Sequence, residues 1–194
     1  LEFDRADIFD NIEAIQKQFH HLVRTVPGNG RIIYPDADVN LRRVLEMGRW
    51  RPTETIGNSG WQAHLLKADG SEFKVQYGEE VFGVVSWSMT GAHNVNNGLA
   101  AIAAARHAGV KPELAIAALN EFAGVKRRME WLGEVNGIQV YDYFAHHPPA
   151  IRTSLEGLRA KVGAERILAI IEPRSNTMRL GVHQSALADS TACA

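Results

Sequence analysis

Apolar residues near the start of the chain recur at the spacing of an amphipathic helix. The positions that share one helical face are Ile12, Ile15, Phe19, Leu22 and Val23. Asp10 and Glu13 have the spacing of a capping box, so we expect Asp10 to be the N-cap and the helix to end before Pro27. A short strand at residues 31–34 and a short helix at residues 40–47 follow. This alternation of strand and helix predicts a mostly parallel sheet.

The pattern then changes to short strand-like runs separated by turn residues. Residues 61–67, 72–77 and 81–87 are the three runs, and they are rich in β-branched and aromatic side chains. Because short turns join antiparallel strands, they predict an antiparallel β patch attached to the α/β domain. We expect three aromatic side chains to fill the core of this patch: Trp61, Phe82 and Trp87. Stacking of a ligand on these rings is the alternative.

A polar cluster stands before an alanine-rich helix predicted at residues 99–105. His93, Asn94 and Asn97 lie in this cluster. An asparagine amide carries a donor and an acceptor side by side, which suits the edge of an adenine. Asn94 and Asn97 share one face if the helix has already begun. We interpret the cluster as a nucleotide site; capping of the helix is the alternative, although one asparagine would suffice for that.

The second part of the chain begins with a predicted hairpin. Asn136 and Gly137 have the sequence of its turn, within residues 130–141. Polar side chains follow the second strand: Asp142, Tyr143, His146 and His147. A helix is predicted from residue 150 to residue 158. Because α/β proteins place ligands where a strand ends before a helix, we interpret this loop as part of a binding site. A solvated histidine turn is the alternative.

An apolar run at residues 167–171 predicts a buried strand, and a second polar cluster follows its end. The members of that cluster are Arg174, Ser175, Asn176, Thr177 and Arg179. Guanidinium groups match carboxylates and phosphates bidentately, so the cluster predicts a carboxylate or phosphate site. A solvated loop is the alternative. We divide the chain into two predicted domains, residues 1–124 and residues 125–194.

Composition restricts the kind of partner. With 45% hydrophobic and 22% charged residues, the sequence is ordinary for a soluble globular protein. The formal net charge of -1 gives no electrostatic reason to bind nucleic acid or a membrane, and no apolar run is long enough to span one. The single cysteine, Cys193, excludes a disulfide within these residues and a Cys-rich zinc site. We expect a cytoplasmic location. Because an initiator methionine is lacking, we also expect the chain to belong to a longer protein.

Three stretches together resemble the Mur ligase family, the ATP-dependent amide-bond ligases of bacterial peptidoglycan synthesis. Residues 91–97 are similar to the family's adenine-binding segment, and Arg128 to an arginine that contacts the nucleotide. Residues 142–148 resemble its Asp-Asp-aromatic-small-His-His-Pro loop. Residues 172–181 are similar to the murein-recycling branch, which joins UDP-N-acetylmuramate to the tripeptide L-Ala-γ-D-Glu-meso-diaminopimelate. The resemblance covers essentially the whole chain.

The resemblance implies an α/β fold: part of a mostly parallel central domain with an antiparallel β patch, then an incomplete Rossmann-like C-terminal domain. It implies ATP and Mg²⁺ as cofactors, UDP-N-acetylmuramate and the murein tripeptide as substrates, and a monomer. The implied nucleotide-binding residues are His93, Asn94, Asn97, Arg128, Asp142, Tyr143 and His146. The implied substrate-binding residues are His147, Arg174, Ser175, Asn176, Thr177 and Arg179. It assigns no catalytic residue and no metal ligand.

Several departures from the family pattern qualify these implications. The 194 residues contain no G-x-x-x-x-G-K-[ST] phosphate loop, which the family carries further upstream. Arg5 stands where the family usually has a histidine near the second magnesium ion, and Pro149 stands where threonine is common. Tyr143 replaces a second aspartate that holds the ribose, and a phenol cannot accept two hydroxyls as a carboxylate can. We therefore expect these residues alone to be inactive. A non-catalytic nucleotide- or peptide-binding module and a purely structural fragment are the alternatives.

Overall fold

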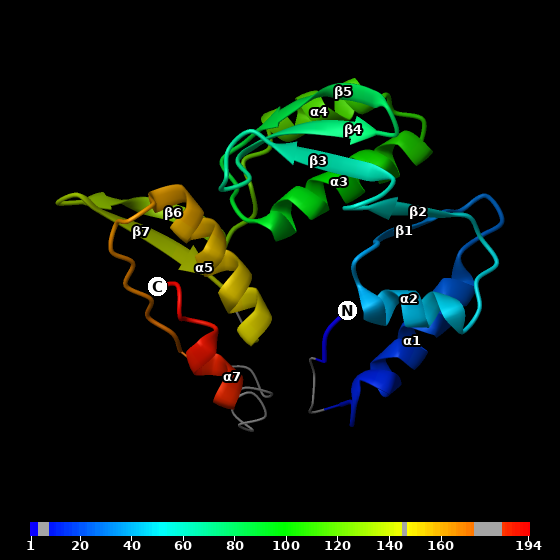
Figure 1. Ribbon diagram of the computed structural model, residues 1–194, viewed down its shortest axis with the longest axis horizontal. Helices are drawn as coiled ribbons and strands as arrows, with labels where there is room; N and C mark the ends of the chain where they lie inside the picture. Colours follow the sequence, from blue (N-terminus) through cyan, green and yellow to red (C-terminus); the bar gives the residue numbers. More distant parts are fainter. Residues whose placement is uncertain (4–7, 145–146, 173–183) are drawn as a thin grey trace.

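The computed structural model describes residues 1–3, 8–144, 147–172 and 184–194, which form two sheets with flanking helices (Figure 1). The first part contains α1 (Ile12–Thr25), β1 (Ile32–Pro35), α2 (Val39–Glu46), β2 (Thr53–Ile56), β3 (Trp61–Leu65), β4 (Glu72–Tyr77), β5 (Glu80–Ser86), α3 (Ala92–His107) and α4 (Pro112–Asn120). The second part contains β6 (Arg128–Val135), β7 (Ile138–Tyr143), α5 (Pro148–Val162) and α7 (Gln184–Asp189).

The larger sheet combines parallel and antiparallel pairs in the order β1-β2-β3-β4-β5. β1 pairs with β2 in parallel, from Ile32 opposite Thr53 to Pro35 opposite Ile56. β2 continues in parallel onto β3, and β3, β4 and β5 then pair as antiparallel neighbours. β6 and β7 form a separate antiparallel hairpin. This arrangement confirms the expected fold class, with a parallel portion, an antiparallel patch and a second α/β part.

Aromatic side chains of the antiparallel strands fill the core between the sheet and α3, as expected. Trp61 is fully buried, and the centroid of its ring lies 5.4 Å from that of the partly buried Phe82. The ring centroids of Phe73 and Trp87 lie 5.5 Å apart. A Cβ at Gly98 would lie 2.8 Å from the Trp87 ring, so a glycine in α3 admits this large side chain. The small residues of α3 thus let the helix pack closely on the sheet.

The start of α1 differs from the expectation by one residue. Asn11, not Asp10, is the N-cap, and its side-chain oxygen accepts a hydrogen bond from the Ala14 N–H at 2.9 Å. Asn11 has the extended backbone that an N-cap requires, with φ -160° and ψ 175°. Both residue types cap helices well, so their order in the sequence did not reveal which of the two would adopt that conformation.

The buried strand expected at residues 167–171 is not formed. Leu168 and Ile170 are 75% and 89% exposed, whereas Ile167, Ala169 and Ile171 line a shallow surface beside α7. The alternation has the period of a strand. A strand also needs a neighbour for its backbone hydrogen bonds, and within the described residues the only sheet of this part is the two-stranded β6–β7 hairpin. The prediction of a buried strand at this apolar run was therefore wrong.

The connection between the two parts runs from the end of α4 at Asn120 to the start of β6 at Arg128. The predicted domain boundary between residues 124 and 125 falls in this connection, and the division stays a prediction. No helix in the described part of the chain combines the length and the apolar character needed to cross a membrane.

Candidate functional site

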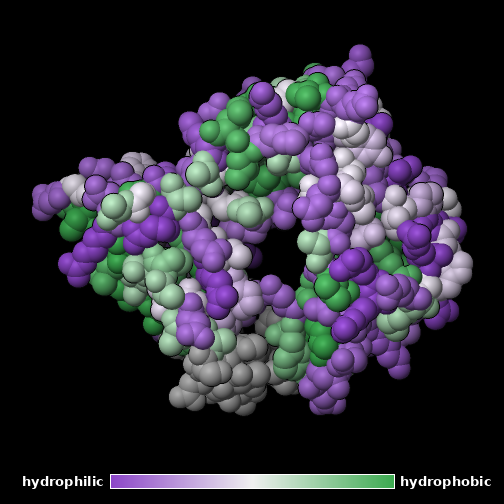
Figure 2. Space-filling model, in the orientation of Figure 1, coloured by the Kyte–Doolittle hydropathy of each residue, from purple (hydrophilic) through white to green (hydrophobic). Residues whose placement is uncertain are grey.

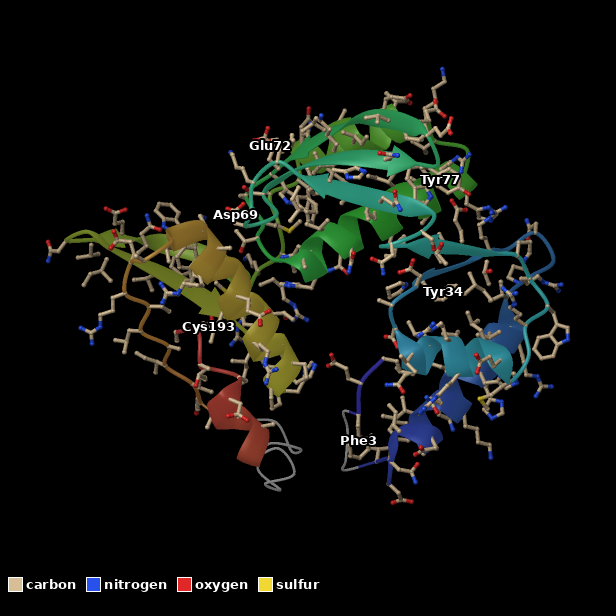
Figure 3. The ribbon with its side chains drawn as sticks, viewed as in Figure 1. Phe3, Tyr34, Asp69, Glu72, Tyr77 and Cys193 are labelled. Carbon is tan, nitrogen blue, oxygen red and sulfur yellow. The ribbon has the colours of Figure 1, made fainter. Side chains whose placement is uncertain are left out.

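The first turn of α3 is fixed by backbone contacts. Gly91 is the N-cap, with φ 92° and ψ 146°, and no side chain caps the helix. The Gly91 N–H donates to the carbonyl of Asp69 at 2.7 Å, in the turn that precedes β4 (Figure 3). Asn94 Nδ2 donates to the carbonyl of Thr90 at 2.7 Å. α3 therefore does not use Asn94 or Asn97 as its cap, which removes the alternative explanation for the asparagine cluster.

The two asparagines differ in how far solvent reaches their side chains. Asn94 is half-buried and Asn97 is exposed. Their spacing of three places both amides on one side of α3. Figure 2 shows an opening through the molecule, and Figure 1 places it next to the start of α3, between α5 and α2. The start of the helix that carries both amides therefore borders an opening.

His93 is the most perturbed titratable group of this cluster. Its side chain is half-buried, and its Nδ1 atom is buried with no hydrogen-bond partner among the described residues. Burial lowers the pKa of the imidazole, and the positive charge of Arg128 lowers it further. A buried nitrogen without a partner is costly, so the site has a vacant hydrogen-bonding position that a polar ligand can satisfy.

Arg128 and Tyr143 lie opposite each other on the hairpin of the second part of the chain. They are partners in the register of the β6–β7 hairpin, so their side chains lie on the same face of it. The positive charge of Arg128 lowers the pKa of the half-buried His93 on α3, so the two side chains lie within electrostatic range of each other. The structure thus pairs Arg128 with Tyr143 on the hairpin and brings the charge of Arg128 within range of His93 on α3.

Asp142 lies on the other face of the hairpin. Successive residues of a strand alternate between faces, so Asp142 points away from the face of Tyr143. The Arg127 Nε atom lies 3.3 Å from a carboxylate oxygen of Asp142, and its guanidinium stacks 5.4 Å from the centroid of the Phe144 ring. The Arg127 N–H also donates to the carboxylate of Glu130 at 2.8 Å. Arg127 therefore orients Asp142, whereas its neighbour Arg128 faces His93.

His147 links the start of α5 to the first residues of the chain. It is the N-cap residue of α5, and its Nε2 atom lies 2.6 Å from the carboxylate of Glu2. The remaining predicted site residues lie outside the described residues: His146, Arg174, Ser175, Asn176, Thr177 and Arg179. Among the residues that are described, no three His, Cys, Asp or Glu side chains gather as a metal site.

Sequence reasoning missed the partners that position this site. Arg127 was visible as half of a dibasic pair, but its contact with Asp142 crosses between two strands, 15 positions apart in the chain. Glu2 carried no signal, because 145 positions separate it from His147. Gly157 lies inside α5, and its sequence position gave no indication of a partner. Such contacts arise from tertiary packing, which no local pattern reports.

Comparison with known proteins identifies the class to which this fold and site belong. The Mur ligase middle domain matches residues 1–105, and the Mur ligase glutamate ligase domain matches residues 127–193. The chain belongs to the Mur ligase family, which confirms the resemblance seen in the sequence. Residues 91–97 of the first match and Arg128 of the second are the segments that the structure brings together.

Among the relatives, the chain is similar to UDP-N-acetylmuramate–L-alanyl-gamma-D-glutamyl-meso-2,6-diaminoheptandioate ligases. It is 56% identical to that of Escherichia coli (strain K12) over 192 residues, which cover 98% of this chain and 42% of the relative. It is 47% identical to that of Haemophilus influenzae over 190 residues, 97% of this chain and 42% of the relative. The chain therefore spans about two fifths of the length of these relatives.

Solved structures agree with this family. A murein peptide ligase from Psychrobacter arcticus 273-4 aligns with 96% of this chain and 40% of its own, at 51% identity and a TM-score of 0.68. A UDP-N-acetylmuramate-alanine ligase from Thermotoga maritima aligns with 95% of this chain and 40% of its own, with a TM-score of 0.71. At 22% identity, the latter shows the shared fold alone.

Proposed function

We propose that this chain is part of an ATP-dependent ligase that joins UDP-N-acetylmuramate to the tripeptide L-Ala-γ-D-Glu-meso-diaminopimelate. The observation that carries the proposal is the close approach of the start of α3 to the second part of the chain, at Gly91 and Gly157, which also brings the charge of Arg128 within range of His93. The identity of 56% to a ligase named for this reaction supports the substrate assignment. A cytoplasmic monomer is part of the same proposal.

The residues at the start of α3 fit a nucleotide. The amides of Asn94 and Asn97 offer donors and acceptors suited to adenine, and the vacant Nδ1 of His93 adds a further polar contact. Arg128 supplies a positive charge for a phosphate or the ribose. We assign Asp142, Tyr143 and His146 to the same nucleotide site. The ion pair with Arg127 would hold the carboxylate of Asp142 in position for this role.

The second part of the chain would hold the amino substrate. The residues assigned to it are His147, Arg174, Ser175, Asn176, Thr177 and Arg179. A tripeptide that ends in diaminopimelate carries several carboxylates, and a guanidinium fork matches a carboxylate bidentately. His147 stands at the N-terminus of α5, where the positive end of the helix dipole favours negative charge, although Pro148 and Pro149 carry no N–H. These features suit an anionic peptide.

The proposed reaction passes through an acyl phosphate. The muramoyl carboxylate attacks the γ-phosphate of ATP and releases ADP, and the amine of the tripeptide then displaces phosphate to form the amide. Mg²⁺ would neutralise phosphate charge when bound, and it commonly takes one or two protein carboxylates together with phosphate oxygens. This chain's own residues would bind and orient the nucleotide and the peptide, which is the main contribution of a protein to phosphoryl transfer.

A non-catalytic binding module is the second candidate, and Tyr143 favours it because a phenol stands where the family holds the ribose with a carboxylate. One experiment separates the two candidates. The full-length protein is incubated with ATP, Mg²⁺, UDP-N-acetylmuramate and the tripeptide, and the ligated product is measured by mass spectrometry. Product that requires both substrates supports the ligase; nucleotide binding without product supports the module. We expect the 194 residues alone, which contain no phosphate loop, to form none.

A further inference from the structure

Two glycines bring α3 and α5 into direct backbone contact beside the candidate nucleotide site. Gly157 is buried within α5. A Cβ added there would lie 2.8 Å from both the Cα and the N of Gly91, and 3.2 Å from the carbonyl carbon of Thr90. These are backbone atoms, which cannot rotate aside as the end of a side chain can. The two helices therefore approach as closely as their main chains allow.

The other side of the contact is restricted in the same way. Gly91 has a φ of 92°, a left-handed value that favours glycine. Its added Cβ would lie 2.8 Å from the His93 ring and 3.3 Å from the carbonyl oxygen of Thr153 on α5. Glycine is unfavourable in the interior of a helix, so Gly157 requires a packing reason, and the contact with Gly91 supplies it.

α5 also packs on the hairpin that carries Arg128. The ammonium of Lys161 lies 5.5 Å from the centroid of the Tyr141 ring, and α5 follows β7 along the chain after a short loop. Tyr141 is two residues before Tyr143, so both side chains lie on one face of β7. α5 therefore connects α3 to the hairpin face that carries Tyr143 and Arg128.

We propose that Gly157 is a positioning residue, which seats α5 on the first turn of α3 and so fixes Arg128 beside His93. This inference rests on the proposed function, because its consequence is the geometry of the nucleotide site. A methyl group at position 157 separates the two helices and moves Arg128 away from His93. Gly157 itself touches neither nucleotide nor substrate.

The test uses the full-length ligase with Gly157→Ala and, as a matched control one residue earlier on the exposed side of α5, Glu156→Ala. We expect Gly157→Ala to raise the KM for ATP and to lower kcat/KM by about tenfold or more, because small displacements in a site have large kinetic effects. Gly157→Ala should leave the KM for UDP-N-acetylmuramate unchanged. The control Glu156→Ala should leave both KM values and kcat/KM unchanged. A purely structural defect would instead lower kcat with the folded fraction and leave the KM for ATP unaltered.

Two results would count against the proposals in different ways. An inactive unmodified enzyme would overturn the proposed function, whereas an active enzyme whose Gly157→Ala variant keeps its KM for ATP would overturn this inference alone. If Gly157→Ala does not fold, native-state hydrogen exchange of the unmodified protein tests instead whether α5 and the start of α3 form one packed unit. The amides of residues 91–96 and 154–160 should then lose protection together as urea increases, and separate loss would overturn the inference.

Discussion

The imidazole of His147 lies 2.6 Å from the carboxylate of Glu2, although 145 positions separate the two residues. Glu2 belongs to the part that matches the middle domain, and His147 to the part that matches the glutamate ligase domain. The pair is therefore a second contact between the two parts, besides that of Gly91 with Gly157. Because the Glu2 side chain is 51% exposed, solvent weakens the interaction.

We expect this pair to make a small but measurable contribution to the stability of the chain. In a double-mutant cycle with Glu2→Gln and His147→Gln, the coupling free energy should be about 0.2–1 kcal/mol, as for other exposed pairs. Urea-induced unfolding of the four proteins measures it. If the two single changes add without coupling, the contact does not stabilise the folded state.

Asn97→Ala should weaken ATP binding by roughly 1–3 kcal/mol in the full-length protein, because it leaves a polar partner on the adenine unpaired. Stability should change little, since Asn97 is exposed and Gly91 forms the N-cap of α3. Asn120→Ala is the matched control, because the Asn120 side chain accepts a hydrogen bond from the Ser86 N–H at 2.8 Å. That control should lower stability and leave ATP affinity intact. Calorimetric titration measures ATP affinity and thermal unfolding measures stability for both variants. If Asn97→Ala lowers stability and leaves ATP affinity intact, the adenine assignment is refuted.

Tyr143→Asp should raise ATP affinity in the full-length protein, because a carboxylate can accept both ribose hydroxyls and occupies less space than a phenol. Tyr141→Asp introduces the same charge two residues earlier and serves as the control. Titration with ATP measures both variants. Equal or lower affinity for Tyr143→Asp would mean that the new carboxylate pairs with Arg128, its cross-strand partner, and that the site has accommodated the tyrosine.

The depressed pKa of His93 predicts a particular dependence of stability on pH. The folded protein resists protonation of this buried imidazole, whereas the unfolded chain accepts the proton below about pH 6.5. The contribution of His93 to the free energy of unfolding is therefore full above that pH and decreases as the pH falls. In denaturant unfolding between pH 8 and pH 5, the free energy of unfolding should fall less for His93→Gln than for the unmodified protein. His64→Gln, at an exposed histidine, is the control. If the free energy of unfolding falls equally with pH in all three proteins, the prediction is contradicted.

The sequence predicted those features that depend on neighbouring residues. Asn136 and Gly137 have φ values of 52° and 78°, which is the conformation that a two-residue hairpin turn requires and that these residue types favour. The aromatic core of the antiparallel patch followed in the same way from alternation along β3, β4 and β5. Local chemistry was sufficient because the partners of each strand are adjacent in the chain.

Features that depend on distant partners were not predictable. Residues 167–171 have the composition of a buried strand, but burial requires neighbours that lie elsewhere in the fold. The meeting of Arg128 with His93 depends on the packing of α5 against α3, and that packing depends on Gly157. The sequence around a glycine in a helix does not indicate which residue that glycine will contact. The resemblance to a family supplied the site residues, but not the contacts that hold them.

The most direct test of a nucleotide site shared by both parts of the chain compares two adjacent arginines. Arg128 faces His93 and should contact the nucleotide, whereas Arg127 pairs with Asp142 on the other face of the hairpin. ATP affinity is measured by calorimetric titration for the full-length protein and for Arg128→Ala and Arg127→Ala. We expect Arg128→Ala to lose about 1.5–3 kcal/mol of binding free energy, the range for hydrogen bonds to charged groups, and Arg127→Ala to lose much less. Unchanged affinity for Arg128→Ala would contradict a nucleotide site formed by α3 and the β6–β7 hairpin together.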